Sequence, residues 1–287
     1  LYFSDGPNDR IMRRTPAGDV SVFLSPCGVA NGLFVDAANR LVMCQSSSPV
    51  GGRAVAVANI ETGKIETGKI ENGKVENGKI ENGKIATGKI KILTDKFEGE
   101  RYISPNDLCV DRKGRVYFTD PHYSGERSQP TSGVYRLDPD GSVTLLIANL
   151  LKPNGIIMTP DNRWVYVSDR GTQKLHRYEV TSSGSLLANG VHYDFAPDRG
   201  IDGMALDAQG NIWGAAGQDA TTGLFVVSPQ GKLLLHQPMP EFSTNVTFGG
   251  VDGKDVYFTA TSSVYLLRST IQGAPSSAGP FTKKDSQ

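Results

Sequence analysis

The motif that decides the fold reads Ser104-Pro105-Asn106-Asp107-Leu108-Cys109-Val110-Asp111. It places an Asn beside a small or acidic residue, directly before a short apolar run. The same arrangement recurs at four other residues, which are Asn31, Asn154, Asp202 and, in a weaker form, Asn245. Repetition of this kind indicates a chain built from structural repeats.

The spacing of the motif is nearly regular. Successive copies from Asn106 onward are separated by 48, 48 and 43 residues. The interval between Asn31 and Asn106 is longer, at 75 residues, and it contains six pentads of the Ile-Glu-Thr-Gly-Lys type over residues 60–89. A single pentad is enough for a turn, and without the other five the interval becomes 50 residues and matches the rest.

Each repeat carries short runs of β-branched and aromatic residues between tight turns. In the repeat of Asn106, a turn at 111–114 leads to a second run at 116–120 and a third at 134–137. These are strand and turn signals, and no stretch of the chain keeps a helical period. Four antiparallel strands in about 45 residues, repeated along the chain, are typical of β-propeller blades.

The repeats predict six blades. Second strands are expected to begin near six residues, which are Leu1, Leu41, Val116, Val165, Ile212 and Val256. The run Leu1-Tyr2-Phe3-Ser4-Asp5 aligns with residues 116–120, so the numbering opens on a second strand. We therefore expect an all-β, six-bladed propeller of four-stranded antiparallel blades, with the first inner strand of one blade missing from the chain as numbered.

The domain organisation expected is one propeller over residues 1–272. The pentads at 60–89 read as a low-complexity insertion in a hairpin of the second blade, either an exposed protrusion or a stacked β-turn element with a binding role. Residues 273–287 are rich in Ser, Gly, Pro and Lys, and we expect a disordered tail there.

Composition restricts the possible partners. Thirty basic and thirty acidic residues give a formal charge of zero, which makes no electrostatic case for nucleic acid or an anionic membrane. No apolar run approaches the roughly 20 residues of a membrane-spanning helix. The three cysteines lack metal-ligand spacing and read as small buried residues. A small-molecule partner is expected, with the protein a monomer or a weak homo-oligomer.

The repeated Asn and Asp residues are expected at the same position in each blade. The first strand of each propeller blade lines the central channel, so residues at the starts of these strands meet at one channel mouth. Their oxygens suit a hard divalent cation, Ca²⁺ or Mg²⁺, better than zinc. The alternative is that each residue only caps a local turn. A site that binds a divalent cation tightly usually has more than one carboxylate, and Asp202 is the only one among these five residues. A further acid is therefore expected on the strand upstream of Leu1.

Other polar residues are expected around the same mouth, because the second strands run back towards it. Arg101 either donates to a substrate oxygen or is a solvated surface charge. His122 is a candidate lid residue or general acid, or else a turn residue, and Tyr123 lies beside it. The chain has no Gly-x-Ser-x-Gly elbow, no His-Glu-x-x-His motif and no phosphate-binding glycine loop.

Four segments together resemble the SMP-30/gluconolactonase/LRE-like family. They are Ser-Pro-Asn-Asp-Leu at 104–108, Val-Tyr-Phe-Thr-Asp-Pro at 116–121, Lys-Pro-Asn-Gly-Ile at 152–156 and Ile-Asp-Gly-Met-Ala-Leu-Asp-Ala-Gln-Gly-Asn-Ile-Trp at 201–213. The resemblance extends from residue 1 to about residue 268, apart from the pentads. It implies a six-bladed propeller from a family of metal-dependent lactone hydrolases.

The resemblance also implies a site. The family binds one divalent ion, commonly calcium, through a Glu, an Asn and an Asp. Asn154 and Asp202 would be metal ligands, Asn106 a ligand or a substrate contact, and the Glu would lie upstream of Leu1. Further candidate substrate contacts are Arg101, His122, Tyr123 and Asn31. Calcium is the cation expected, with magnesium, manganese and zinc as alternatives.

The implied reaction is hydrolysis of a small lactone, such as gluconolactone. The cation would polarise the lactone carbonyl, and water would attack it with Asp202 as the base. Two alternatives stay open at this point. One is a non-catalytic propeller that binds a metal or small ligand, and the other is a related propeller esterase or phosphotriesterase.

Overall fold

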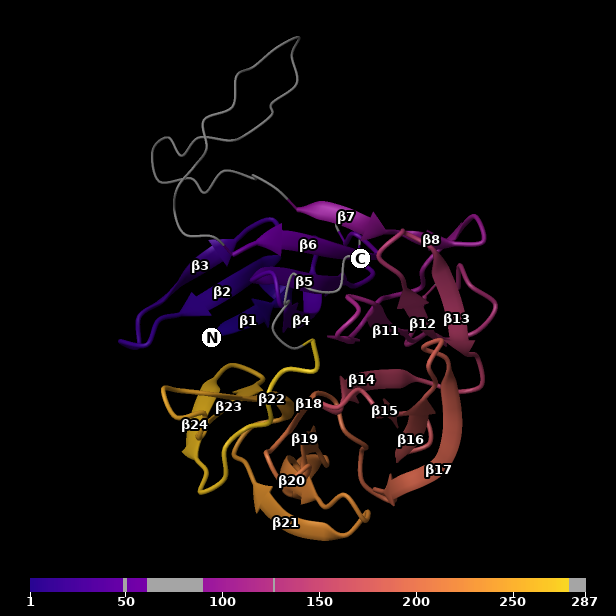
Figure 1. Cartoon of the computed structure of the whole chain (residues 1–287). Helices are drawn as coiled ribbons and strands as arrows, with labels where there is room; N and C mark the ends of the chain where they lie inside the picture. The colour runs from indigo at the N-terminus through magenta and orange to yellow at the C-terminus, as the bar shows by residue number, and fades with distance from the viewer. Residues whose placement is uncertain (49–50, 61–89, 126, 279–287) are drawn as a thin grey trace, which may run out of the picture.

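The computed structural model describes residues 1–48, 51–60, 90–125 and 127–278. Within these ranges the chain forms 24 strands and two short 3₁₀ helices, η1 (Gly6–Asn8) and η2 (Asp219–Thr221). Six antiparallel sheets are arranged as blades around one axis (Figure 1), so the predicted six-bladed propeller is confirmed. No helix in the described part of the chain is long and apolar enough to cross a membrane.

The blades follow one another around the ring in chain order. The first contains β1 (Tyr2–Asp5), β2 (Arg10–Arg14) and β3 (Val20–Leu24). The second contains β4 (Ala30–Val35), β5 (Arg40–Gln45), β6 (Ala54–Asn59) and β7 (Lys91–Thr94). The third contains β10 (Leu108–Val110), β11 (Val116–Asp120), β12 (Gly133–Leu137) and β13 (Val143–Ile147).

The remaining three blades complete the ring. The fourth contains β14 (Pro153–Met158), β15 (Trp164–Asp169), β16 (Lys174–Val180) and β17 (Leu186–Asp194). The fifth contains β18 (Met204–Leu206), β19 (Ile212–Ala216), β20 (Gly223–Val227) and β21 (Leu233–Pro238). The sixth contains β22 (Ser243–Gly249), β23 (Asp255–Ala260) and β24 (Val264–Arg268), and a separate hairpin pairs β8 (Lys96–Phe97) with β9 (Glu100–Arg101).

A repeated hydrogen bond shows that β1 is a second strand. The hydroxyl of Thr119 in β11 donates to the carbonyl of Asn154 in the next blade at 2.7 Å. Ser4 in β1 makes the same bond to the carbonyl of Asn31 at 2.6 Å. The sheet of the first blade accordingly has the order β1-β2-β3, without an inner strand beside β1 among the described residues.

Local turn chemistry ends each inner strand. Asp111 follows β10, and its Oδ1 accepts hydrogen bonds from the backbone N–H groups of Lys113 and Arg115, both at 2.9 Å. Asp36 and Asp207 cap the corresponding turns of the second and fifth blades in the same way. An Asp carboxylate that takes up two backbone donors stabilises such a turn, as the repeated Asp signal predicts.

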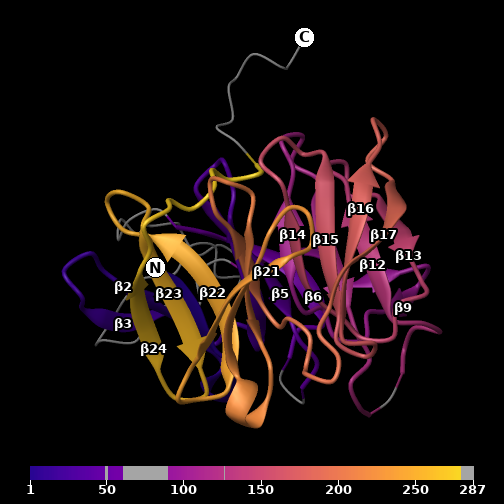
Figure 2. The same ribbon diagram turned by 90° about the horizontal axis from the view of Figure 1, so that it is seen from below.

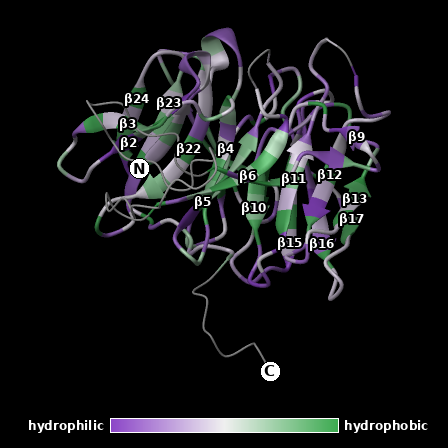
Figure 3. Ribbon diagram, turned by 90° about the horizontal axis from the view of Figure 1, so that it is seen from above, coloured by the Kyte–Doolittle hydropathy of each residue, from purple (hydrophilic) through white to green (hydrophobic). Residues whose placement is uncertain are grey.

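The apolar core lies between adjacent blades. At the interface of the second and third blades, the rings of Phe118 and Tyr135 stack with centroids 5.4 Å apart, and Tyr102 packs edge-on against both. The strands run side by side along the height of the ring in Figure 2, and apolar residues follow β6 and β10 in Figure 3. Burial of each such side chain contributes about 1.5–3 kcal/mol, so apolar contacts between blades hold the ring together.

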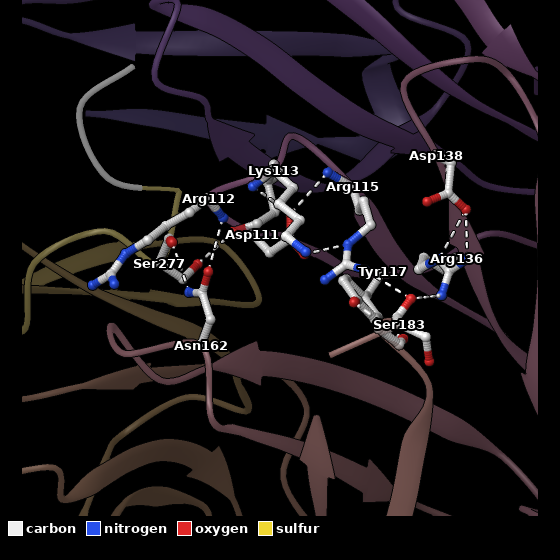
Figure 4. A network of polar contacts seen from close by, with 12 residues as sticks. Asp111, Arg112, Lys113, Arg115, Tyr117, Arg136, Asp138, Asn162, Ser183 and Ser277 are labelled. Carbon is white, nitrogen blue, oxygen red and sulfur yellow. Dashed lines mark hydrogen bonds and ion pairs between the residues drawn. The ribbon is translucent and has the colours of Figure 1, made fainter. Parts of the chain in front are cut away.

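The chain then crosses the end of the ring opposite the starts of the inner strands. We name residues Gly273–Ala278 the C-terminal strap. Gly273 bridges to Asp207, and Ser277 donates through its hydroxyl to the carbonyl of Val110 at 2.7 Å. The Asn162 side chain donates to the Ser277 carbonyl at 2.8 Å (Figure 4). The strap therefore links the fifth, third and fourth blades.

The strap differs from the disordered tail expected from Gly273. Ser277 and Ala278 are both 5% exposed, because these small side chains fit between the turns that end the inner strands. Residues 279–287 lie outside the described part of the chain. Nearly all of the pentad segment, residues 61–89, lies outside it as well, so its predicted protrusion stays a prediction.

Candidate active site

The repeated Asn and Asp residues lie at the same end of five inner strands. Asn31, Asn154 and Asn245 are in the first residues of β4, β14 and β22, whereas Asn106 and Asp202 stand two residues before β10 and β18. The five strands contact one another in the order β4, β10, β14, β18 and β22, around the axis seen in Figure 1. The five residues thus surround one mouth of the central channel, which we call the channel mouth.

Small residues let neighbouring blades approach closely here. A Cβ atom on Gly155 would lie 2.1 Å from the backbone oxygen of Asp202, and one on Gly32 would lie 2.5 Å from Oδ1 of Asp107. The Gly32 N–H donates to the Asn106 carbonyl at 2.7 Å. At positions 32 and 155, glycine is therefore required by the contact between blades, since any larger residue would push the strands apart.

Asp202 is paired with a buried arginine. Nη1 of Arg199 lies 3.0 Å from Oδ2 of Asp202, and the two side chains are 4% and 23% exposed. Burial raises the pKa of Asp202, while the guanidinium groups of Arg199 and Arg170 and a hydrogen bond from the Asn154 side chain oppose that rise. The carboxylate is thus held by charged partners on one side and remains partly open to the channel.

Asn154 and Tyr123 form a second contact at the channel mouth. The buried Asn154 donates through Nδ2 to the hydroxyl of Tyr123 at 2.7 Å. Burial and the nearby Asp202 carboxylate raise the pKa of Tyr123, whereas the positive charge of Arg170 acts in the opposite direction. Arg170 also faces the Tyr123 ring, with 6.0 Å between the guanidinium carbon and the ring centroid. The phenol is therefore neutral at physiological pH and fixed over Asn154.

Asn106 and its neighbour Asp107 differ in their surroundings. The side-chain amide of Asn106 has no hydrogen-bond partner in the described part of the chain, although the residue is only 8% exposed. The Asp107 carboxylate accepts from the N–H groups of Leu108 at 2.9 Å and Ile156 at 3.1 Å. Burial, with a smaller effect of the Asp202 charge, raises the pKa of Asp107 to about 7. The Asp107 carboxyl is thus used within the fold, whereas the Asn106 amide has no such bond.

Buried aspartates at the ends of the second strands hold the loops that lead to the site. The Asp120 carboxylate accepts from the N–H groups of Ile103 and Ser104, ahead of Asn106. Asp169 accepts in the same way from the N–H groups of Leu151 and Lys152, ahead of Asn154. These carboxylates therefore fix where each inner strand begins.

The other predicted site residues lie apart from this group. Arg101 is exposed on β9, and its guanidinium donates to the carbonyl of Gly52. The His122 ring nitrogen Nε2 is 3.0 Å from the Gly125 carbonyl within its own loop. Oδ1 of Asn245 accepts from the next N–H group at 2.8 Å, and Asn31 is exposed. The structure thus brings together Asn154, Tyr123 and Asp202, whereas Arg101, His122 and Asn245 have other partners.

A cleft of about 320 Å³ lies at the opposite end of the propeller, lined by turn residues that include Asp111, Arg112 and Lys113. Its polar groups are largely used within the fold (Figure 4). Nε of Arg115 lies 2.6 Å from the Asp111 carboxylate, and its Nη1 donates to the Ser183 carbonyl at 2.8 Å. These paired groups indicate a structural role for the cleft.

Comparison with known proteins identifies the family. Residues 1–262 match the family model of the SMP-30/gluconolactonase/LRE-like region. The chain belongs to the SMP-30/gluconolactonase/LRE-like family. A gluconolactonase of Zymomonas mobilis is 30% identical over 305 aligned residues, which cover 95% of this chain and 76% of that protein. The lactonase drp35 of Staphylococcus epidermidis is 34% identical over 112 residues, which cover 38% of this chain and 34% of that protein.

Solved structures of other proteins agree with this fold. A gluconolactonase of Xanthomonas campestris superposes with a TM-score of 0.75 at 28% identity, covering 93% of this chain and 81% of that one. The calcium-binding protein regucalcin of Agrobacterium tumefaciens has a TM-score of 0.70 at 17% identity, which shows the shared fold alone, over 96% of this chain and 88% of that one.

Two charged residues at the mouth of this SMP-30/gluconolactonase/LRE-like protein were missed by sequence reasoning. They are Asp107 and Arg199. Asp107 had a signal, since it is an acid inside the repeated motif. Arg199 had none, because it does not differ from the other basic residues of the sequence. Arg170 directly follows the second strand of its blade, and that position predicts a place at the rim of the mouth.

Proposed function

We propose that this protein hydrolyses a small lactone, of the sugar-lactone class, at the channel mouth. The observation that carries the proposal is the arrangement of Asn154 and Asp202 at one end of the ring, where the Asn154 side chain acts on the pKa of the Asp202 carboxyl. Both residues lie in motifs by which the chain resembles its family, which contains gluconolactonases and lactonases. The side chains at this mouth are polar, which suits a hydroxylated ring ester.

A divalent cation fits the donors at this mouth. No group of three or more His, Cys, Asp or Glu residues able to hold a metal occurs among the described residues, so carboxamide oxygens would have to contribute. Asn106 offers an unpaired amide, and Asn154 has Oδ1 available because its Nδ2 is engaged by Tyr123. With Asp202, these residues would hold the ion. Oxygen donors of this kind favour calcium, and the regucalcin neighbour is named as calcium-binding.

Each residue at the mouth has a separate catalytic role in this proposal. A bound cation would supply electrophilic polarisation of the lactone carbonyl. Asp202 would accept the proton of the attacking water as the new C–O bond forms, and would return it to the ring oxygen as the ring C–O bond breaks. Asn106 would orient the ester, and the hydroxyl of Tyr123 would donate to a substrate oxygen at the rim. The product is the open hydroxy acid.

The decisive experiment measures release of acid from glucono-1,5-lactone by the purified protein. We expect activity that is lost on treatment with a chelator and restored by added Ca²⁺, with Mg²⁺, Mn²⁺ and Zn²⁺ as comparisons. Spontaneous hydrolysis is subtracted with the D202A variant at equal concentration. Activity that is unaffected by chelation would refute the cation dependence.

A substrate panel separates the alternatives. Cation binding without turnover of any lactone would show a non-catalytic binding propeller. Faster turnover of an aryl ester or a phosphotriester than of any lactone would show the related propeller chemistry. Both outcomes would contradict the proposed lactonase function.

A further inference from the structure

Arg199 connects three segments of the propeller beneath the channel mouth. It precedes β18, and its Nε donates to the carbonyl of Gly217, just after β19, at 3.0 Å. Its Nη2 donates to the carbonyl of Ser243, at the start of β22 in the next blade, at 2.7 Å. Its Nη1 donates to Oδ2 of Asp202 at 3.0 Å. The planar fork of the guanidinium therefore sets the distance between the carboxylate and two backbone segments.

The loop above Arg199 is itself anchored. The guanidinium carbon lies 4.1 Å from the ring centroid of Phe242, which covers it from solvent. The preceding residue, Glu241, accepts hydrogen bonds from Ser262 and from the hydroxyl of Tyr265 at 2.8 Å. These bonds hold the loop that carries Glu241 and Phe242 to the β23–β24 turn. The Phe242 ring is therefore kept in place over the Arg199 guanidinium.

We propose that Arg199 is a positioning residue for Asp202. This inference rests on the proposed function and goes beyond it, because none of the family motifs contains Arg199. By occupying Oδ2, the guanidinium leaves Oδ1 as the oxygen that faces the channel and fixes its direction. The same bonds tie that direction to the junction between the fifth and sixth blades. Arg199 itself contacts neither substrate nor cation.

The proposal predicts a kinetic effect that simple destabilisation would not give. In the Arg199→Gln variant we expect kcat to fall roughly 10- to 100-fold, with KM changed less than about threefold, as is usual when a partner that orients a ligand is lost. Calcium affinity, measured by titration calorimetry, should weaken by a similar factor. The control is Arg163→Gln, which removes an exposed guanidinium 3.7 Å from Glu179 and should behave as wild type.

Chemical rescue distinguishes positioning from folding. We expect millimolar methylguanidinium to restore part of the kcat of a folded Arg199→Ala variant, and to leave the wild type and Arg163→Gln unchanged. If the Gln and Ala variants do not fold, the Arg199→Lys variant tests the positioning role, because an ammonium group cannot reach all three acceptors. We expect this variant to have kcat and calcium affinity lower than wild type by roughly 10-fold.

The outcomes separate the two proposals. Lack of lactone turnover by the wild type refutes the proposed function, whereas the calcium affinities of the variants still test Arg199. Wild-type kcat and calcium affinity in folded Arg199→Gln, or in Arg199→Lys, would overturn the positioning role even if the protein is an active lactonase.

Discussion

The amide nitrogen of Asn154 donates to the hydroxyl of Tyr123 across 2.7 Å, and this contact joins the fourth blade to a loop of the third. It also determines the orientation of the amide, because Nδ2 faces the phenol and leaves Oδ1 free. The rim residue Tyr123 thus acts on a residue that we place in the site.

Removal of this hydroxyl should therefore reduce catalysis without unfolding the protein. In Tyr123→Phe, Nδ2 loses its acceptor and the amide can rotate, which costs about 1–1.5 kcal/mol. We expect kcat/KM for glucono-1,5-lactone to fall roughly 10-fold, with a melting temperature lower than that of wild type by no more than about 3 °C. Equal kcat/KM in the two proteins would show that the contact does not orient Asn154.

The Asp202→Asn substitution should reduce turnover far more than it reduces the affinity for substrate analogues. The amide keeps the shape of the side chain but cannot accept the proton of water, and general bases contribute roughly 10²- to 10⁴-fold. We expect kcat to fall in that range, while the affinity for a non-hydrolysable lactam analogue changes only a few-fold. Wild-type turnover in this variant would remove Asp202 from the mechanism.

Calcium should stabilise the folded protein independently of activity. A cation that binds only the native state at 100 times its Kd adds about 2.7 kcal/mol, which raises the melting temperature by about 5 °C. We expect this rise in the wild type by differential scanning calorimetry, and a smaller one in Asp202→Asn. A chelator should reverse it. No rise at millimolar Ca²⁺ would contradict the cation site.

Gly155→Ala should disturb the junction between the fourth and fifth blades. The added Cβ would lie 2.1 Å from the Asp202 carbonyl oxygen, so the backbone that carries Asp202 has to move. We expect a loss of about 1–3 kcal/mol in the free energy of unfolding, together with lower kcat. Gly6→Ala is the matched control, because no atom lies within 4 Å of its added Cβ.

The C-terminal strap should contribute to stability and leave catalysis unchanged. Ser277→Ala removes a buried hydroxyl donor and leaves the Val110 carbonyl unpaired, at a cost of about 1–3 kcal/mol. We expect a melting temperature lower by about 2–6 °C, with wild-type kcat because the strap lies at the other end of the channel. The exposed neighbour variant, Ser276→Ala, should lose less. An equal loss in both variants would show that the strap is not held by Ser277.

The repeat pattern by itself determined most of the architecture. Five of the described blades carry an Asn or Asp at the start of the inner strand, and three of them have an Asp-capped turn after it. These features are local, so they appear at regular intervals along the chain and predict the number of blades. The same regularity identified Asn106, Asn154 and Asp202 as residues of one mouth.

Only the tertiary structure decided which other side chains meet there. Arg199 reaches Asp202 and the start of β22 because the closed ring brings the ends of the fifth and sixth blades together, and no local pattern marks it. Arg101 precedes Asn106 by five residues, yet it bonds to Gly52 because its hairpin packs on another loop. A repeat specifies the blade, whereas the contacts between blades depend on how the whole ring closes.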